Sequence, residues 1–179
     1  MLNCDIVDQI ITSEANPGIT YTWSTTNGNI VGPMEGTSIV VDMPGTYTRI
    51  ITDNLTGCST SNDFEVLQDI IDPDVNAGPG GMLTCTETVV ALDGSGSVGN
   101  NFIYEWTTVD GAFSGPVNDL EAFANTPGTY TLTVFNTENM CSASSDVVVT
   151  VDPDIPTGCL LYTSPSPRDA TLSRMPSSA

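Results

Sequence analysis

The sequence predicts an all-β protein built from two tandem β-sandwich domains, followed by a disordered tail. Three observations support this prediction. The 179-residue chain matches itself at an offset of 83 residues, short stretches of alternating polar and apolar residues recur, and clusters of glycine, proline, asparagine and aspartate separate these stretches. Short strands at regular spacing, without a helical period, are typical of a sandwich.

The internal repeat is carried by matching landmarks in one order. The segment 21–25 (YTWST) corresponds to 104–108 (YEWTT), and the segment 44–48 (PGTYT) recurs unchanged at 127–131. Matching landmarks of this kind indicate tandem domains of about 80 residues. We therefore expect a first repeat at 1–72, a linker and first strand at 73–81, a second repeat at 82–156 and a non-native or disordered tail at 157–179.

The strands are clearest in the second repeat. Phe102–Trp106 places three aromatic residues on one face, Thr129–Phe135 alternates polar and apolar residues, and Asp146–Val151 is short and β-branched. These patterns predict half-buried strands. Turn-forming residues fill the segments Asp93–Ser97 and Asn136–Asn139 between them.

Proline and aspartate mark the joints after each repeat, at Ile71–Gly81 and at Asp152–Pro156. Proline limits strand continuation, so we expect a short and semi-rigid connection at each joint.

The last 21 residues differ in composition from everything before them. Two of the three arginines, Arg168 and Arg174, lie in the segment 159–179, where no strand or helix period is visible. This segment resembles the conceptual translation of a sequencing-library adapter, and is excluded from fold reasoning. Residues 1–158 then hold 21 acidic side chains and one arginine, for a net charge of −20.

Charge and composition exclude several functions. The whole chain has a net charge of −19, with three arginines, no lysine and no histidine. Binding to nucleic acid or to anionic membranes needs clustered basic residues, so neither partner is expected. No apolar run approaches the roughly 20 residues that a transmembrane helix needs, so no membrane insertion is expected.

The second repeat resembles a PKD domain, an immunoglobulin-like fold. The resemblance is carried by Val89–Ser97, Tyr104–Trp106 and Pro127–Val134, and more narrowly by Asn76–Pro79, Leu83–Cys85 and Met140–Ala143. The last three segments are similar to the cysteine-bearing PKD-like repeats of large bacterial surface adhesins. That family implies secretion, often with gliding-motility or type IX secretion sorting domains at the C-terminus. The first repeat departs from the pattern at Ile11–Ala15.

Apart from Cys159, each repeat has two cysteines. Four cysteines allow three pairings, and repeat symmetry favours Cys4–Cys58 and Cys85–Cys141. Each bond would close a loop of roughly 55 residues and contribute about 4 kcal/mol. Free buried thiols and a metal site are the alternatives, although there is no C-x-x-C spacing and no histidine for a metal.

Six aromatic residues occupy matching positions in the two repeats. Their places on alternating strands favour the sandwich core or its corner over stacking on sugar rings. They are Tyr21, Trp23, Tyr47, Tyr104, Trp106 and Tyr130.

Carboxylates are the only abundant reactive groups. A glycosidase-like acid pair drawn from Asp93, Glu105, Asp110 and Asp119 is the one enzymatic mechanism to consider, but small sandwiches offer little cleft, so we expect no enzyme. No cofactor is expected either, with calcium as the alternative. Calcium favours oxygen ligands, and the joints offer Asp72, Asp74, Asp152 and Asp154. Plain solvated charge is the preferred interpretation of these aspartates.

Arg49 occupies the register position of Leu132, an inward position on a central strand. A buried guanidinium needs a carboxylate partner. We therefore expect Arg49 either at a partly exposed rim or in an ion pair.

The sequence favours a structural or adhesive repeat region of a secreted or cell-surface bacterial protein, acting as a stalk that projects a terminal domain. Met1 corresponds to the internal Met82, so we expect a fragment without its signal peptide. Adjacent repeats of the same chain are the expected partners, with a polysaccharide or a surface protein as further candidates. The alternatives are a carbohydrate- or protein-binding module and an accessory region of a secreted hydrolase.

Overall fold

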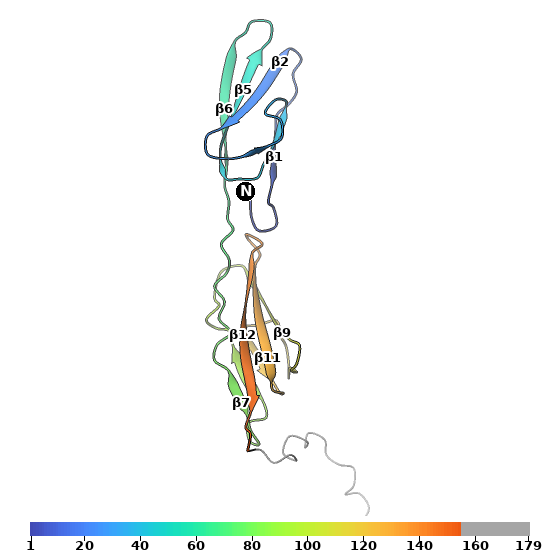
Figure 1. Cartoon of the computed structure of the whole chain (residues 1–179), viewed down its shortest axis with the longest axis vertical. Helices are drawn as coiled ribbons and strands as arrows, with labels where there is room; N and C mark the ends of the chain where they lie inside the picture. The colour runs from blue at the N-terminus through green and yellow to red at the C-terminus, as the bar shows by residue number, and fades with distance from the viewer. Residues whose placement is uncertain (155–179) are drawn as a thin grey trace, which may run out of the picture.

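The computed structural model describes residues 1–154, which form two β-domains arranged end to end (Figure 1). This part of the chain contains strands and no helix, and therefore no helix that could cross a membrane. The predicted tail at 157–179 lies outside the described residues.

The first domain consists of two antiparallel three-stranded sheets. One sheet has the order β1-β4-β3 and the other has the order β2-β5-β6. The strands are β1 (Gln9–Thr12), β2 (Ile19–Thr25), β3 (Ile30–Val31), β4 (Ser38–Val41), β5 (Gly45–Asp53) and β6 (Ser59–Val66).

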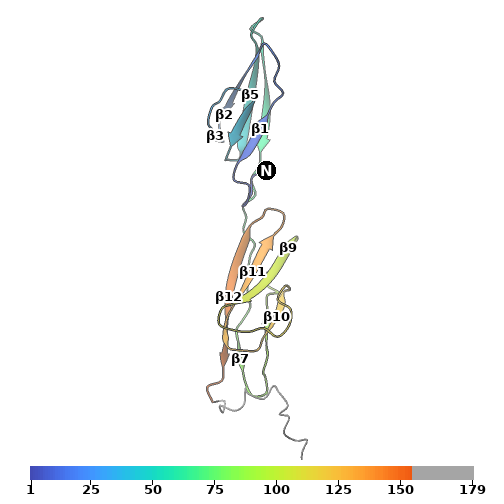
Figure 2. The ribbon, with the colours of Figure 1, turned by 90° about the vertical axis from the view of Figure 1, so that its right-hand side faces the viewer.

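The second domain repeats this plan. One sheet pairs β10 with β8, and the other has the order β7-β12-β11-β9 (Figure 2). The strands are β7 (Gly81–Leu83), β8 (Val90–Asp93), β9 (Phe102–Thr108), β10 (Glu121–Ala124), β11 (Gly128–Asn136) and β12 (Ser142–Val151). The predicted fold class, two tandem immunoglobulin-like sandwiches, is confirmed, whereas the predicted domain boundaries stay a proposal.

In each domain the segment that enters pairs in parallel with the segment that leaves. β7 pairs with β12 through Leu83 and Val151, and in the first domain Leu2 forms the equivalent parallel bridge with Gln68. All other pairings between named strands are antiparallel within residues 1–154. The chain therefore enters each domain at one end and leaves it at the other.

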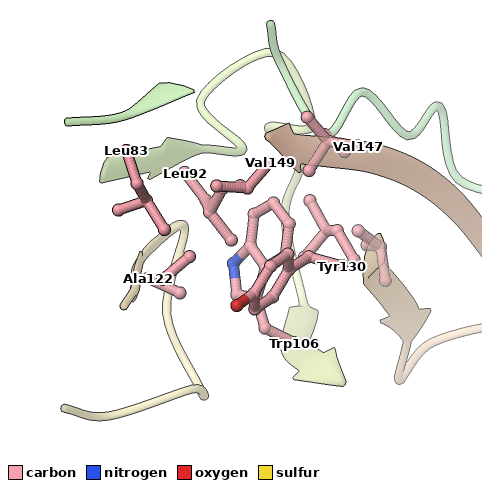
Figure 3. Close-up of a cluster of buried hydrophobic side chains, with 11 residues drawn as sticks. Leu83, Leu92, Trp106, Ala122, Tyr130, Val147 and Val149 are labelled. Atoms are coloured by element: carbon pink, nitrogen blue, oxygen red, sulfur yellow. The ribbon is translucent and has the colours of Figure 1, made fainter. Parts of the chain in front are cut away.

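A tryptophan lies at the centre of each core. Trp106 packs with Leu83, Leu92 and Val149 in the second domain (Figure 3). Its indole N–H donates to the carbonyl of Asp119 at 3.1 Å. Each core thus buries the ring and satisfies its one polar group.

The indole of Trp23 makes the matching bond in the first domain, to the carbonyl of Gly36 at 2.9 Å. Both acceptors lie 13 residues after their tryptophan. The two domains therefore anchor their central ring in the same way.

A tyrosine ties the corner of each sandwich together. Tyr130 is fully buried, and its hydroxyl donates to the carbonyl of Thr126 at 2.7 Å and accepts from the amide of Ala112 at 3.1 Å. Gly111 must be glycine here, because a Cβ would lie 2.5 Å from the Tyr130 hydroxyl oxygen. Tyr47 takes the equivalent place in the first domain.

Five of the six aromatic residues singled out in the sequence are buried, and one is partly exposed. The buried ones are Tyr21, Trp23, Tyr47, Trp106 and Tyr130, and the partly exposed one is Tyr104, which packs against the edge of the second core.

Arg49 is half-buried, and its guanidinium packs against two aromatic rings that also contact each other. Its guanidinium carbon lies 5.1 Å from the centre of the Phe64 ring and 5.8 Å from that of Trp23. Its Nη1 donates to the hydroxyl of Ser13 at 2.5 Å, whereas its buried Nε has no partner. Of the two arrangements that the sequence left open, Arg49 therefore takes the partly exposed one, and aromatic faces and a hydroxyl contact its guanidinium.

Substituting Arg49→Leu is expected to leave the melting temperature unchanged or to raise it by a few degrees. The change removes an unsatisfied buried N–H, which costs about 1–3 kcal/mol, and gives up cation–π contacts worth about 0.5–2 kcal/mol. The reverse change, Leu132→Arg, is expected to destabilise the second domain strongly, because Leu132 is fully buried. Thermal unfolding of both variants tests this, and a large loss of stability in Arg49→Leu would contradict it.

Candidate functional site: the joint between the domains

A disulfide connects the two domains. Cys4 and Cys141 are bonded, with their Cα atoms 5.1 Å apart and 137 residues between their positions in the sequence. Cys4 follows the bridging Leu2 of the first domain, and Cys141 lies immediately before β12 in the β11–β12 hairpin of the second. Closing a loop of this length contributes about 5 kcal/mol in the chain-entropy account.

The predicted pairings Cys4–Cys58 and Cys85–Cys141 are wrong. Cys58 is a free, exposed thiol, and Cys141 is bonded to Cys4. Cys85 also takes part in a disulfide, but not with Cys141.

Strand direction explains the error. Leu2 pairs with Gln68 just beyond the end of β6, whereas Cys58 stands just before the start of that strand. Ten residues of extended chain span about 33 Å, and a disulfide needs Cα atoms within about 7 Å. Cys4 therefore lies at the opposite end of its domain from Cys58, and next to the hairpin of the following domain.

A buried asparagine carries the hydrogen bonds of the joint. Asn139 is 1% exposed. Its amide nitrogen donates to the Asp69 carboxylate at 3.0 Å and to the carbonyl of Ile71 at 2.8 Å. Its side-chain oxygen accepts from the amide of Cys141 at 3.1 Å, and its main-chain oxygen accepts from the amide of Cys4 at 3.1 Å. One residue of the second domain is thus bonded to two segments that belong to the first.

These bonds hold Asp69 in its charged form. The Asn139 side chain, and after it the amide of Ile71, lower the pKa of the Asp69 carboxyl below its ordinary value of 3.8. A lowered pKa means that the folded protein favours the carboxylate, so Asp69 stabilises the fold at neutral pH.

A hollow of about 410 Å³ lies beside this network. Three aspartates and two asparagines line it, together with apolar residues. Its lining residues are Asp69, Ile71, Asp72, Pro73, Asp74, Val98, Phe102, Asn136 and Asn139.

The four aspartates proposed for calcium do not form one site. Asp72 and Asp74 line the hollow at the joint. Asp152 and Asp154 follow β12, whose 10 residues separate them from the joint, so they lie at the far end of the second domain. Calcium stays a prediction at each joint, with Asp72 and Asp74 at the first and Asp152 and Asp154 at the second.

Asp72 also lies close to the disulfide. One of its carboxylate oxygens and the sulfur atoms of Cys4 and Cys141 lie within 4.8 Å of one another. Metals bind thiolates, and both sulfurs are committed to the disulfide, so this group is not a metal site in the oxidised protein.

The carboxylates considered for an acid pair have local partners in turns. Asp93 accepts from the amide of Ser95 at 2.9 Å, and the Ser95 side chain and amide lower its carboxyl pKa. Asp110 accepts from the amide of Thr129 at 2.8 Å, and Asp119 from that of Leu120 at 2.7 Å. Glu105 lies exposed on β9. Turn formation accounts for the three aspartates.

Sequence reasoning missed Asn139 and Asp69 as a pair. The repeat offset places Thr56 opposite Asn139, but residues 53–57 differ from residues 136–140 at every position, so the sequence did not single out Asn139.

No family model and no curated protein matches this chain. Among solved structures, it is similar to three N-terminal domains of the bacteriophage RB49 highly immunogenic outer capsid protein, at 17% identity and a TM-score of 0.43, over 80% of this chain and 54% of that one. It is similar to an I-band fragment of titin at 16% identity and a TM-score of 0.42, over 84% and 60%.

The PKD domain of the KIAA 1837 protein matches at 26% identity and a TM-score of 0.35, over 47% of this chain and 92% of that domain. Because all three TM-scores are below 0.5, the fold assignment here depends on the strand order and pairing themselves.

Substituting Asn139→Ala is expected to cost about 1–3 kcal/mol of unfolding free energy, because it leaves buried groups on both sides of the joint without partners. The matched control is Thr56→Ala in the first hairpin, where a bond of 3.3 Å from the exposed amide of Cys58 and a side-chain bond to Asp53 are lost. That control should stay within about 0.5 kcal/mol of the wild type. Equal losses in the two variants, measured by denaturant unfolding under oxidising conditions, would contradict the role of Asn139.

The stabilisation from Asp69 is expected to depend on pH. It should be complete above the ordinary carboxyl pKa of 3.8 and should be lost as the pH falls through the lower pKa of the folded state. Asp69→Asn keeps an oxygen acceptor for Asn139 but does not titrate. The difference in unfolding free energy between wild type and this variant should therefore shrink between about pH 6 and about pH 2. A difference that stays constant over this range would count against the assignment.

Proposed function

We propose that the two domains form a load-bearing section of a stalk that holds a terminal domain away from a bacterial cell surface. The observation that carries this proposal is the disulfide between consecutive domains at their joint. Entry and exit at opposite ends of each domain suit a head-to-tail array.

The disulfide changes the path of a pulling force. Load applied at the N-terminus passes through Cys4 directly to Cys141 and leaves along β12. A sequence separation of 137 places 136 residues inside the covalent ring, where no tension reaches them. The oxidised section then keeps its length when a domain unfolds, which is the property that a spacer needs.

The compartment follows from the same bond. Disulfides persist outside the reducing cytoplasm, so the disulfide supports an extracellular location. Attachment to a bacterial surface and partners among adjacent repeats of the same chain come from the resemblance to PKD-like adhesin repeats.

A carbohydrate-binding role has less support. Sugar-binding surfaces present exposed aromatic rings. Among the described residues, both tryptophans are buried, and Phe123 is the one exposed aromatic side chain, with 37% of its surface accessible. The accessory role beside a secreted hydrolase stays an alternative.

Single-molecule stretching from the two ends of the chain tests the spacer function. Under oxidising conditions the ring of 136 residues should contribute no extension. After reduction, unfolding of both domains should release roughly 450–490 Å of contour length, at about 3.3–3.6 Å per residue.

The double variant Cys4→Ser/Cys141→Ser should gain extension without any reductant, and adding a reductant should release whatever length the disulfide of Cys85 still holds. Full-length extension of the oxidised wild type would overturn the proposed force path. Micromolar binding of the two-domain protein on a glycan array would instead support the binding-module alternative.

A further inference from the structure

We propose that Cys58 is the covalent attachment point for a preceding repeat of the same kind, whose cysteine in the Cys4 position bonds to it. The proposal extends the spacer role to a third domain and rests on it for its biological meaning. The evidence is the correspondence between the hairpin that carries Cys58 and the hairpin whose Cys141 is already bonded to a neighbour.

The β5–β6 hairpin has a defined backbone around Cys58. The amide of Gly57 donates to the carbonyl of Asp53 at 2.8 Å, and the amide of Asp53 donates to the carbonyl of Cys58 at 2.9 Å. Gly57 has a φ of +72°, in the left-handed region.

The β11–β12 hairpin repeats each of these features. The amide of Met140 donates to the carbonyl of Asn136 at 2.9 Å, and the amide of Asn136 donates to the carbonyl of Cys141 at 2.9 Å. Met140 has a φ of +61°, although a side chain disfavours this region. The two hairpins therefore present their cysteines on the same backbone geometry.

The two cysteines differ in what covers them. Cys141 is 0% exposed and bonded to Cys4 of the preceding domain. Cys58 is free and exposed. A repeat docked on the first hairpin, as the first domain docks on the second hairpin, would account for the position of Cys58.

The main-chain part of this docking needs no particular side chain. The amide of Cys4 donates to the main-chain oxygen of Asn139, and Thr56 offers a main-chain oxygen at the equivalent position. The donor segment also recurs, because residues 1–4 (MLNC) correspond to residues 82–85 (MLTC). Thr56 lacks the side-chain amide that Asn139 uses in the joint. The first hairpin therefore recognises its partner mainly through the thiol and the backbone.

The bond forms by thiol–disulfide exchange with a small-molecule disulfide. The Cys58 thiolate attacks oxidised glutathione, and one glutathione thiolate leaves. The thiolate of the incoming cysteine then attacks the Cys58 sulfur, and the second glutathione leaves. Two protein thiols lose two protons and two electrons, and one oxidised glutathione becomes two reduced glutathione molecules.

A fusion that places residues 1–81 directly in front of the full chain tests the proposal. This arrangement restores the natural spacing, because Gly81 precedes Met82, the counterpart of Met1. The front copy carries Cys58→Ser, so that a single Cys58 remains. Cleavage before aspartates then leaves the front Cys4 in a peptide that starts at Met1, and the second Cys4 in a peptide that starts at Asp74.

After oxidation with a glutathione buffer, mass spectrometry should find the front Cys4 linked to Cys58 in most molecules. The reaction of Cys58 with maleimide should fall at least tenfold relative to the chain alone. The bond between the second Cys4 and Cys141 reports that the original joint has formed. A reactive Cys58 beside an intact Cys4–Cys141 bond would overturn the proposal.

The control fusion carries Cys4→Ser in its front copy and cannot form the new bond. If the front repeat docks as proposed, it still shields Cys58, and the maleimide reaction should be slower than in the chain alone. A rate equal to that of the chain alone would overturn the docking geometry. Either negative result leaves the force path through Cys4–Cys141 intact, so the two proposals fail separately.

Discussion

The parallel pairing of the first and last strands determines the rest of the structure. Because β7 runs alongside β12, and Leu2 alongside Gln68, both strands of each pair point toward the exit end of the domain. A cysteine two residues after the first strand therefore faces the next domain and lies far from the hairpin cysteine of its own. An antiparallel first strand would place it at the other end. The strand direction thus selects a bond between domains over a bond within one.

The joint combines that bond with a satisfied polar network. A buried amide without partners would destabilise the interface, but Asn139 bonds to Asp69, Ile71 and Cys141. Its amide nitrogen reaches chain segments of the first domain, and its oxygen stays within the second. Such a network has directional requirements that apolar contact lacks, so it fixes the register between domains as well as their proximity.

The sequence predicted the architecture well and the joint poorly, for physical reasons. Alternation and turn residues are local, so the strands at Phe102–Thr108 and Gly128–Asn136 follow from neighbours in the chain. Cysteine pairing is not local: repeat symmetry allows Cys141 to bond within its repeat or to the repeat before it. The repeat register placed Arg49 opposite Leu132. Its contacts Phe64 and Ser13, however, lie on another strand and in a loop, so the local sequence did not reveal them.

The shortage of cations gives the joint its chemical character. Residues 1–154 hold 21 acidic side chains and one arginine, and that arginine packs against two aromatic rings of the first domain. Two such domains repel each other at distances within the Debye length of about 8 Å, and no lysine is present to neutralise Asp69 at the joint. A neutral amide donor and a covalent bond do not need a counter-charge. Asn139 and the disulfide therefore supply contacts that a strongly acidic repeat protein can make without a counter-charge.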